Sequence, residues 1–292
     1  MRNGLAICRG LAAAVALLSA ANGLHAMPLA PAFRGQFAQG QGVDAQFIKV
    51  RDDWRGSGVL YDPETDQLGA GQPIGSFRGG SGLWGLVDWK TAHQSAPADM
   101  VEGRWSGRVA EIAFGDEEFD SLYRDSWAAV ALAPLFGPGG TASTQDNWTS
   151  HFSGYIRISE AGAYNFGVLH DDGFFFNLGG AAGETRSLSN DFLNPRNRMS
   201  FSSSLLLDVG LYAFELGAYE HLEAGVVELS WTRDDGAWSR IPTSHLVATG
   251  DAASVPEPGT WAMALGGLAA LGAVMSRRRG ARSGSPATLL PA

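Results

Sequence analysis

The sequence predicts an all-β fold for the middle of this 292-residue chain, and three observations support the prediction. Apolar residues alternate with polar ones over short segments, as they do in strands with one buried face. Glycine is abundant, with 39 residues, and glycine-containing turns separate the segments. The apolar residues do not recur at helical spacing. Together these features favour a β-sandwich or a jelly roll, in which two sheets bury a shared core.

The clearest strand pattern lies between Trp148 and Val247. Its first segment places Phe152 and Ile156 on one face, and a turn at Gly162 leads into the next segment. In chain order, the expected strands are 151–158, 164–169, 174–178, 205–207, 212–216 and 226–231, with a long polar loop from about 180 to 198. We therefore expect one β domain over residues 82–250.

The segment 27–81 is rich in glycine and glutamine, and we expect an irregular N-terminal extension that contributes one or two edge strands. The sequence from Gly80 to Gly85 matches the pattern G-x-G-x-x-G. No alternation of strand and helix surrounds it, so we interpret it as a flexible lead-in to the domain rather than a nucleotide site.

The N-terminal residues 1–26 have the layout of a secretory signal peptide. Arg2 and Arg9 are followed by an apolar stretch, and small residues end the segment at Ala26. An N-terminal helix buried in the domain is the alternative. The layout predicts an exported protein.

The C-terminal part has three sections that follow a short linker at 251–254. Pro256, Glu257 and Pro258 precede an uncharged run of about 17 residues, which is close to the shortest helix that spans a bilayer. An arginine cluster at 277–279 follows, and arginines stay on the cytoplasmic side, so the body of the protein lies outside the inner membrane.

This arrangement resembles the PEP-CTERM sorting signal of exopolysaccharide-producing bacteria over residues 255–280. The resemblance implies that an exosortase-type processing enzyme recognises Pro256-Glu257-Pro258 and removes the transmembrane helix. The protein would then be held in the inner membrane transiently and be released to the cell surface or the extracellular matrix. The tail at 281–292 departs from the family, whose members end soon after the arginines. A permanent membrane anchor is the alternative.

Cysteine content and charge exclude several classes of function. Cys8 is the single cysteine and lies in the signal peptide, so disulfides, cysteine nucleophiles and thiolate zinc sites are excluded. Six of the 21 Lys and Arg residues but only one of the 30 acidic residues lie in the two targeting segments and the tail that follows the second, which leaves 15 basic and 29 acidic residues, a net charge of −14. Such a body repels nucleic acid and is able to hold divalent cations.

The expected domain resembles the PA-fourteen-like (protective-antigen-type) β-sandwich, which also occurs in fungal flocculins and some glycosidases. Three features carry the resemblance: an opening strand at 152–156, a glycine turn with an aromatic strand at 161–166, and an acidic turn at 171–173. A closing hairpin from Tyr219 to Trp231 and an exit at Ile241-Pro242 complete it. The first half of the domain matches poorly.

The acidic turn is the sharpest candidate for a binding site. Asp171 and Asp172 offer carboxylate oxygens on a loop, the ligands that Ca²⁺ prefers. In sugar-binding members of the family a cis peptide joins two such aspartates, so the resemblance implies that both ligate calcium while the hydroxyls of a sugar complete the shell. Additional ligands are suggested by loop position, at Asn190, Asp191 and Glu220. The alternative is an ordinary turn, because Asp-Gly is a common turn pair.

Two other acidic and histidine patterns carry less information. Asp234-Asp235-Gly236 has the same letters as the acidic turn and is expected to be a hairpin loop. No H-x-H or H-E-x-x-H pair suggests zinc, and no G-x-S-x-G elbow is present. His170 is expected at the surface, at the end of a strand; a role beside Asp171 in orienting a carboxylate is the alternative.

We therefore expect a protein that is not an enzyme and that binds polysaccharide or a cell-surface glycan, assisted by calcium. A structural or adhesive matrix protein without a specific ligand is the first alternative. A glycan-acting hydrolase is the second, because the paired carboxylates of such enzymes meet in space rather than in sequence.

Overall fold

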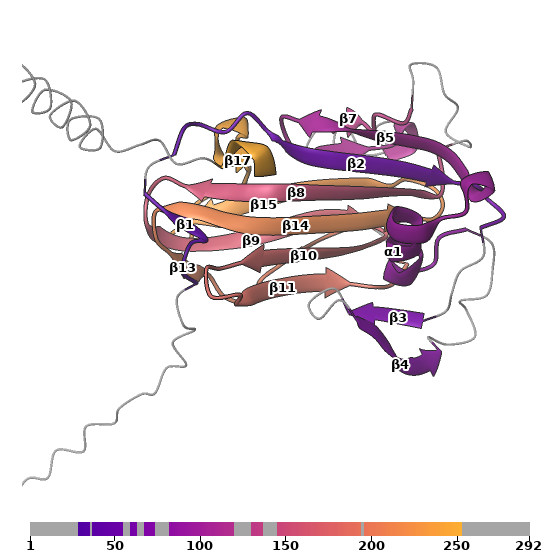
Figure 1. The fold of residues 1–292 in the computed structure, drawn as a ribbon, viewed down its shortest axis with the longest axis horizontal. Helices are drawn as coiled ribbons and strands as arrows, with labels where there is room; N and C mark the ends of the chain where they lie inside the picture. Colours follow the sequence, from indigo (N-terminus) through magenta and orange to yellow (C-terminus); the bar gives the residue numbers. More distant parts are fainter. Residues whose placement is uncertain are drawn as a thin grey trace, which may run out of the picture.

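The computed structural model describes residues 29–35, 37–54, 59–62, 67–73, 82–119, 130–136, 145–193 and 196–252. In this part of the chain, strands from two large sheets stack face to face, and the prediction of an all-β sandwich is confirmed (Figure 1). The expected signal peptide, sorting motif and transmembrane helix lie outside these ranges. Within them, no helix is long and apolar enough to cross a membrane.

The first sheet has the strand order β11-β10-β14-β8-β2-β5, with β1 paired to β14 and β17 paired to β8. Its strands are β1 (Phe33–Arg34), β2 (Val43–Val50), β5 (Val101–Val109), β8 (Trp148–Ile158), β10 (Gly173–Gly179), β11 (Thr185–Asn190), β14 (Gly210–Glu220) and β17 (Leu246–Val247).

The second sheet has the order β12-β9-β15-β6-β7, with β13 paired to β9 and β16 paired to β15. Its strands are β6 (Ala113–Gly115), β7 (Ala131–Leu132), β9 (Gly162–Asp171), β12 (Asn197–Ser200), β13 (Leu205–Leu207), β15 (Val226–Arg233) and β16 (Ser239–Arg240). The remaining elements are a separate ladder of β3 (Val59–Asp62) with β4 (Gln67–Pro73), the helix α1 (Leu86–Ser95), and short 3₁₀ turns at Ala98–Met100, Thr243–His245 and Thr249–Asp251.

The core lies between the two sheets and follows from strand alternation. Phe152 and Ile156 of β8 are buried, as the sequence predicts, and belong to the same hydrophobic cluster as Phe166 and Val168 of β9. The polar residues between them face outward and stay half-exposed on β8. Burial of each large apolar side chain of this kind contributes roughly 1.5–3 kcal/mol to the stability of the fold. The hydrophobic pattern therefore fixes which face of each strand is internal.

Two expectations about individual strands were wrong, the first of them in part. The segment 27–81 was expected to supply one or two edge strands; β1 pairs with β14 alone among the described strands, but β2 lies between β8 and β5 and pairs with both along most of its length. The polar segment after Gly180 was expected to be a loop, but it forms β11 and β12 at the margins of the two sheets. Both margin strands are half-exposed and polar, so they show little of the alternation that identifies a core strand.

The helix α1 covers part of the outer face of the first sheet (Figure 1). Its Trp89 packs edge to face on Phe175, and its indole N–H donates to the carbonyl of Ser150 at 2.8 Å. Gly217 of β14 permits this close approach, because a Cβ there would lie 2.2 Å from the Phe175 ring and 2.7 Å from Trp89. This helix encloses a second apolar cluster that the sequence did not reveal.

The strand β8 runs the full length of the sandwich and defines two ends. Trp148 begins it opposite Glu220, and Ile158 ends it opposite Gly210. We call the end at Trp148 the acidic end, because Asp116, Asp171, Asp172 and Glu220 all follow or end strands there. The end at Ile158 is called the opposite end.

Candidate functional site

Asp171 and Asp172 lie at the acidic end, in the turn that carries the chain from the second sheet to the first. Asp171 ends β9 opposite Val226, and Gly173 begins β10 opposite Tyr219. The peptide bond between the two aspartates is cis, as the family resemblance implies for its sugar-binding members. Both residues are largely buried, at 9% and 7% exposure. The turn thus places two adjacent carboxylates where the two sheets meet.

Two crossing loops flank this turn. One leads from β11, whose Asn190 pairs with Phe174, to β12, whose Asn197 pairs with His170. In that loop the Arg196 guanidinium lies 3.6 Å from Asp171 Oδ2. The positions of the strand ends therefore hold this loop against the turn on one side.

The other loop connects β14 to β15 and is tied to the turn by hydrogen bonds. The backbone N–H of His221 donates to Asp172 Oδ2 at 2.9 Å. The backbone N–H of Asp172 donates in return to the carbonyl of Tyr219 at 3.0 Å. The turn and this loop therefore form one unit.

Two further carboxylates lie beneath the turn. Glu220 is 1% exposed, and neither of its carboxylate oxygens has a hydrogen-bond partner among the described residues. Asp116 is also 1% exposed and accepts the N–H groups of Phe119 and Gly225. Gly225 separates the two, because a Cβ there would lie 2.2 Å from Glu220 Cγ and 2.9 Å from Asp116 Oδ2. The glycine allows the two carboxylates to approach the same stretch of backbone.

Burial and mutual repulsion shift the titration of this cluster. Burial, and then the charge of Asp172, raise the pKa of Asp171 to about 8, although Arg196 opposes the shift. Burial raises the pKa of Asp116 to about 7 in spite of its two backbone hydrogen bonds. Burial and the nearby charges of Asp116 and Asp172 raise the pKa of Glu220 well above its usual value. A cation at this end of the sandwich would offset the cost of ionising these groups.

His170 was expected at the surface, and this expectation was wrong. The residue is fully buried, and its ring packs on Phe174 with 4.4 Å between centroids. Its Nδ1 lies 2.6 Å from the carbonyl oxygen of Asp172, so Nδ1 carries the proton and donates to that oxygen. Burial lowers the pKa of His170, which keeps the ring neutral. The histidine therefore supports the turn from below.

The other ligands suggested by loop position have different roles. Asp191 Oδ1 accepts the backbone N–H of Leu86 at 2.6 Å and so ties the loop after β11 to the start of α1. The amide of Asn190 faces the sulfur of Met199. Of the three, Glu220 lies close enough to Asp171 and Asp172 for their charges to raise its pKa. Asp116, which the sequence did not suggest, belongs to the same group.

Apolar side chains are exposed around the acidic turn. Phe192 and Leu193 in the loop after β11 are 56% and 39% exposed, and Leu222 in the β14–β15 loop is 53% exposed. Next to the same loop, the ring of Trp84 lies 4.6 Å from that of His221. Both loops that flank the carboxylates therefore present apolar surface to the solvent, which is typical of sites that bind a partly apolar ligand.

The donor chemistry at this turn fits calcium, with part of the shell supplied from elsewhere. Asp171 and Asp172 offer hard carboxylate oxygens, and Ca²⁺ takes six to eight oxygen ligands. Within the described ranges, no three carboxylate, histidine or cysteine side chains converge closely enough to hold a metal ion by themselves. Backbone carbonyls, water and ligand hydroxyls would have to supply the remaining oxygens.

Asp234 and Asp235 form the hairpin turn between β15 and β16. Both have positive φ angles, 49° and 57°, as a tight hairpin with right-handed twist requires. Asp234 Oδ1 accepts the backbone N–H of Ala163 at 3.0 Å, and both residues are exposed. The tripeptide Asp-Asp-Gly thus forms a solvent-exposed turn here and a buried one at Asp171.

Two protein-family models match the chain. The model of the PA14 domain matches residues 137–244, which include the acidic turn and the β14–β15 loop. The model of the PEP-CTERM protein-sorting motif matches residues 254–279, which include Pro256-Glu257-Pro258. No curated protein matches the chain.

Several solved structures, two of them of PA14 domains, resemble the chain at low sequence identity. The PA14 domain of the antifreeze protein MpAFP is 16% identical, with a TM-score of 0.46 over 76% of this chain and 98% of that one. The A domain of epithelial adhesin 6 from Candida glabrata, in complex with Galβ1-3GlcNAc, is 13% identical, with a TM-score of 0.45 over 77% and 94%. The PA14 sugar-binding domain from an RTX adhesin is 17% identical, with a TM-score of 0.41 over 71% and 98%.

Proposed function

We propose, from the premise that the chain carries a PA14 domain followed by a PEP-CTERM sorting motif, that it is an exported surface or matrix protein that binds carbohydrate without modifying it. The observation that carries the proposal is the pair of adjacent, buried carboxylates at Asp171 and Asp172, flanked by two loops with exposed apolar side chains. A sugar combines hydroxyl groups with apolar ring faces, so a site of this composition suits it.

In this proposal Asp171 and Asp172 hold calcium through their carboxylate oxygens. When bound, the ion supplies coordination positions for two neighbouring hydroxyls of a sugar. His170 and the N–H of His221 keep the Asp172 backbone and carboxylate in place, through contacts of 2.6 and 2.9 Å. Arg196, 3.6 Å from Asp171 Oδ2, partly neutralises the charge of Asp171.

Phe192 and Leu222 would contact the ring of the sugar from the two sides of the turn. They belong to two different loops, each of which connects the first sheet to the second, so the width of the site depends on how the β11–β12 and β14–β15 loops are held. Asp191 fixes the first loop to α1, and the hydrogen bond from His221 fixes the second. Selection among glycans would then depend on these loops, while calcium would recognise the hydroxyl pair common to many sugars.

The position of the C-terminus supports the orientation that such a function needs. The described chain ends at Ala252, which packs against Phe37, Leu211 and Val247 at the opposite end of the sandwich. The sorting motif begins a few residues later. While the protein is held in the membrane, the acidic end would therefore face away from the bilayer, toward matrix polysaccharide.

The experiment that tests the function is a glycan array, probed with the full chain in millimolar calcium and again in chelator. We expect binding to a restricted set of glycans in calcium alone. Asp171→Asn should lose this binding, whereas Asp235→Asn, in the exposed turn with the same letters, should keep it. Absence of binding by the wild type in both conditions would favour a structural matrix protein without a specific ligand.

A further inference from the structure

Arg157 differs from every other arginine that the structure describes. It is the penultimate residue of β8, at the opposite end of the sandwich from Asp171. Its backbone carbonyl accepts a hydrogen bond from His245 Nδ1 at 2.7 Å, which fixes the main chain there. Its guanidinium has no hydrogen-bond or ion-pair partner among the described residues. The guanidinium groups of the other described arginines each have a hydrogen-bond or ion-pair partner: Arg34, Arg51, Arg104, Arg108, Arg186, Arg196, Arg198, Arg233 and Arg240.

An unpaired guanidinium is unexpected in a chain with this charge. Acidic residues outnumber basic ones by 29 to 15 once the targeting segments are set aside, so carboxylate partners are plentiful. Arginine offers five N–H donors in a fixed plane, and these are normally matched by carboxylates or carbonyls. The half-buried Arg157 side chain therefore presents an unused set of donors.

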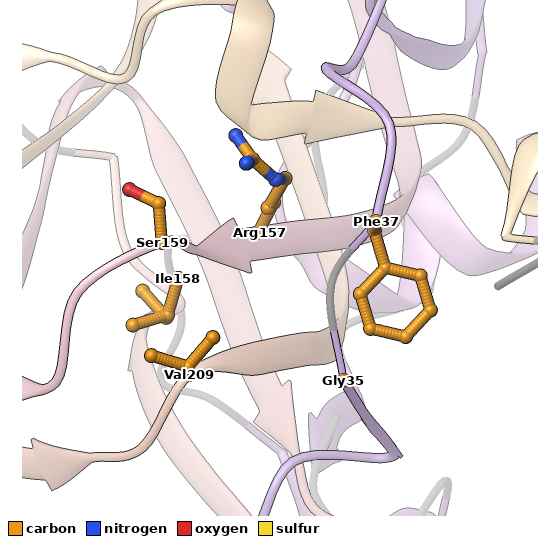
Figure 2. A pocket seen from close by; sticks show the side chains of 6 residues that line it. All are labelled: Gly35, Phe37, Arg157, Ile158, Ser159 and Val209. Atoms are coloured by element: carbon orange, nitrogen blue, oxygen red, sulfur yellow. The ribbon is translucent and has the colours of Figure 1, made fainter. Parts of the chain in front are cut away.

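Arg157 lines a pocket with a volume of about 330 Å³. Figure 2 shows its side chain extending from β8 between Ser159 and the segment that carries Phe37. The remaining wall is formed by Gly35, Ile158 and Val209. The pocket lining thus combines a guanidinium and a hydroxyl with an aromatic ring and aliphatic side chains.

We propose that this pocket binds the carboxylate of an acidic sugar residue, such as a hexuronate, with the carboxylate on Arg157 and the ring against Phe37 and Val209. A planar guanidinium pairs with a carboxylate through two parallel hydrogen bonds. The volume is at the lower end of the range for ligand pockets, about 300–1,000 Å³, and fits one sugar unit better than a longer segment. Ser159 offers a hydrogen bond to a ring hydroxyl.

A carboxylate fits this pocket better than a phosphate. A single guanidinium neutralises one negative charge, whereas phosphate carries nearly two and is usually met by several cationic or backbone donors. The pocket lining includes one cationic side chain, and the surrounding body is strongly acidic. The excess negative charge therefore disfavours a dianion more than a monoanion.

The pocket is separate from the calcium site of the proposed function. The two lie at opposite ends of β8, whose eleven residues span roughly 33 Å at the rise of an extended strand. A protein with both sites would hold two different parts of a polysaccharide, or two chains at once, and would so gain affinity through multivalency. The pocket does not depend on calcium, so each site is testable without the other.

The test is calorimetric titration of the full chain in detergent, with chelator present, using sodium galacturonate, galactose and inorganic phosphate as separate probes. We expect the affinity for galacturonate to exceed that for galactose by at least about tenfold, which is the difference that a charge-assisted hydrogen-bond pair typically supplies. Arg157→Gln should abolish this preference. Arg157→Lys, which keeps the charge but loses the planar fork, should retain a reduced preference and guards against misfolding of the first variant.

Arg34→Gln is the matched control, because Arg34 lies at the same end of the sandwich but is exposed and paired with Asp208. It should leave galacturonate binding unchanged. Equal affinity for galacturonate and galactose, unchanged binding by Arg157→Gln, or binding of phosphate in preference to galacturonate would each overturn the proposal. Asp171→Asn should bind galacturonate as the wild type does, whatever its behaviour with calcium.

Discussion

Asp172 and His221 are joined by a hydrogen bond of 2.9 Å from the backbone N–H of His221 to the carboxylate of Asp172. The two residues are 49 positions apart, and the bond links the turn between β9 and β10 to the loop between β14 and β15. The binding of a ligand to the carboxylates therefore also depends on the position of that loop. This coupling makes the acidic end a single site rather than a set of separate loops.

Phe192→Ser should weaken glycan binding without a change in melting temperature. The side chain is 56% exposed, so its loss costs little folding energy, while loss of contact with a sugar ring should reduce affinity about fivefold. Glycan titration in calcium checks this. Leu206→Ser is the control, since Leu206 is 62% exposed on β13 and distant from the acidic turn. An equal loss of binding in both variants would contradict the assignment of Phe192 to the site.

Glu228→Ala should destabilise the second sheet by about 3 kcal/mol. Glu228 is 1% exposed and accepts hydrogen bonds from Arg198 at 2.7 Å and from Arg240 at 2.9 Å. Its removal leaves two partly buried guanidinium groups without their shared acceptor, which is costly. Denaturant unfolding measures the change. Glu111→Ala removes an exposed partner of the same Arg240 and should cost less than about 1 kcal/mol.

Acidification should destabilise the fold through His93. Burial, and then the charge of His151, lower the pKa of His93 from about 6.5 to about 3. His93 therefore binds a proton below about pH 6.5 in the unfolded chain, but only below about pH 3 in the folded protein. Stability from this group is fully present above pH 6.5 and is lost as the pH falls, by up to about 1.4 kcal/mol per pH unit.

His93→Gln isolates this effect, because glutamine is neutral at every pH. Gln46, Thr149, Trp89, His151 and Arg104 are the groups that face His93. Denaturant unfolding at pH 7 and pH 5 should show about 2 kcal/mol less acid destabilisation in the variant than in the wild type. The same pH dependence in both proteins would show that His93 is not the titrating group.

The sequence predicted most clearly those strands whose two faces differ. On β8 and on the first half of β9 the buried residues alternate with half-exposed ones, so a period of two is visible in the sequence. On β11 and β12 polar residues occupy both faces, and no period distinguishes such margins from a loop. The helix α1 was missed because its buried face includes Asp88, which accepts the indole N–H of Trp54 at 3.0 Å.

Only those residues of the site that are neighbours in the sequence could be predicted from it. Asp171 and Asp172 are adjacent, so their turn is visible in the chain and in its family resemblance. Asp116 is brought to Gly225 by the pairing of β6 with β15, across 109 positions, and no local signal marks it. Arg157 has an ordinary place in an alternating strand, and only the structure reveals that no described residue pairs with its guanidinium.

The most direct measurement of the central claim is the melting temperature of the full chain in chelator and in calcium. If Asp171 and Asp172 hold the ion, calcium at about 100 times its dissociation constant should stabilise the fold by about 2.7 kcal/mol, a rise of roughly 5 °C or more. Asp171→Asn should abolish the rise, and Asp235→Asn should preserve it. Identical melting temperatures of the wild type in chelator and in millimolar calcium would contradict the account.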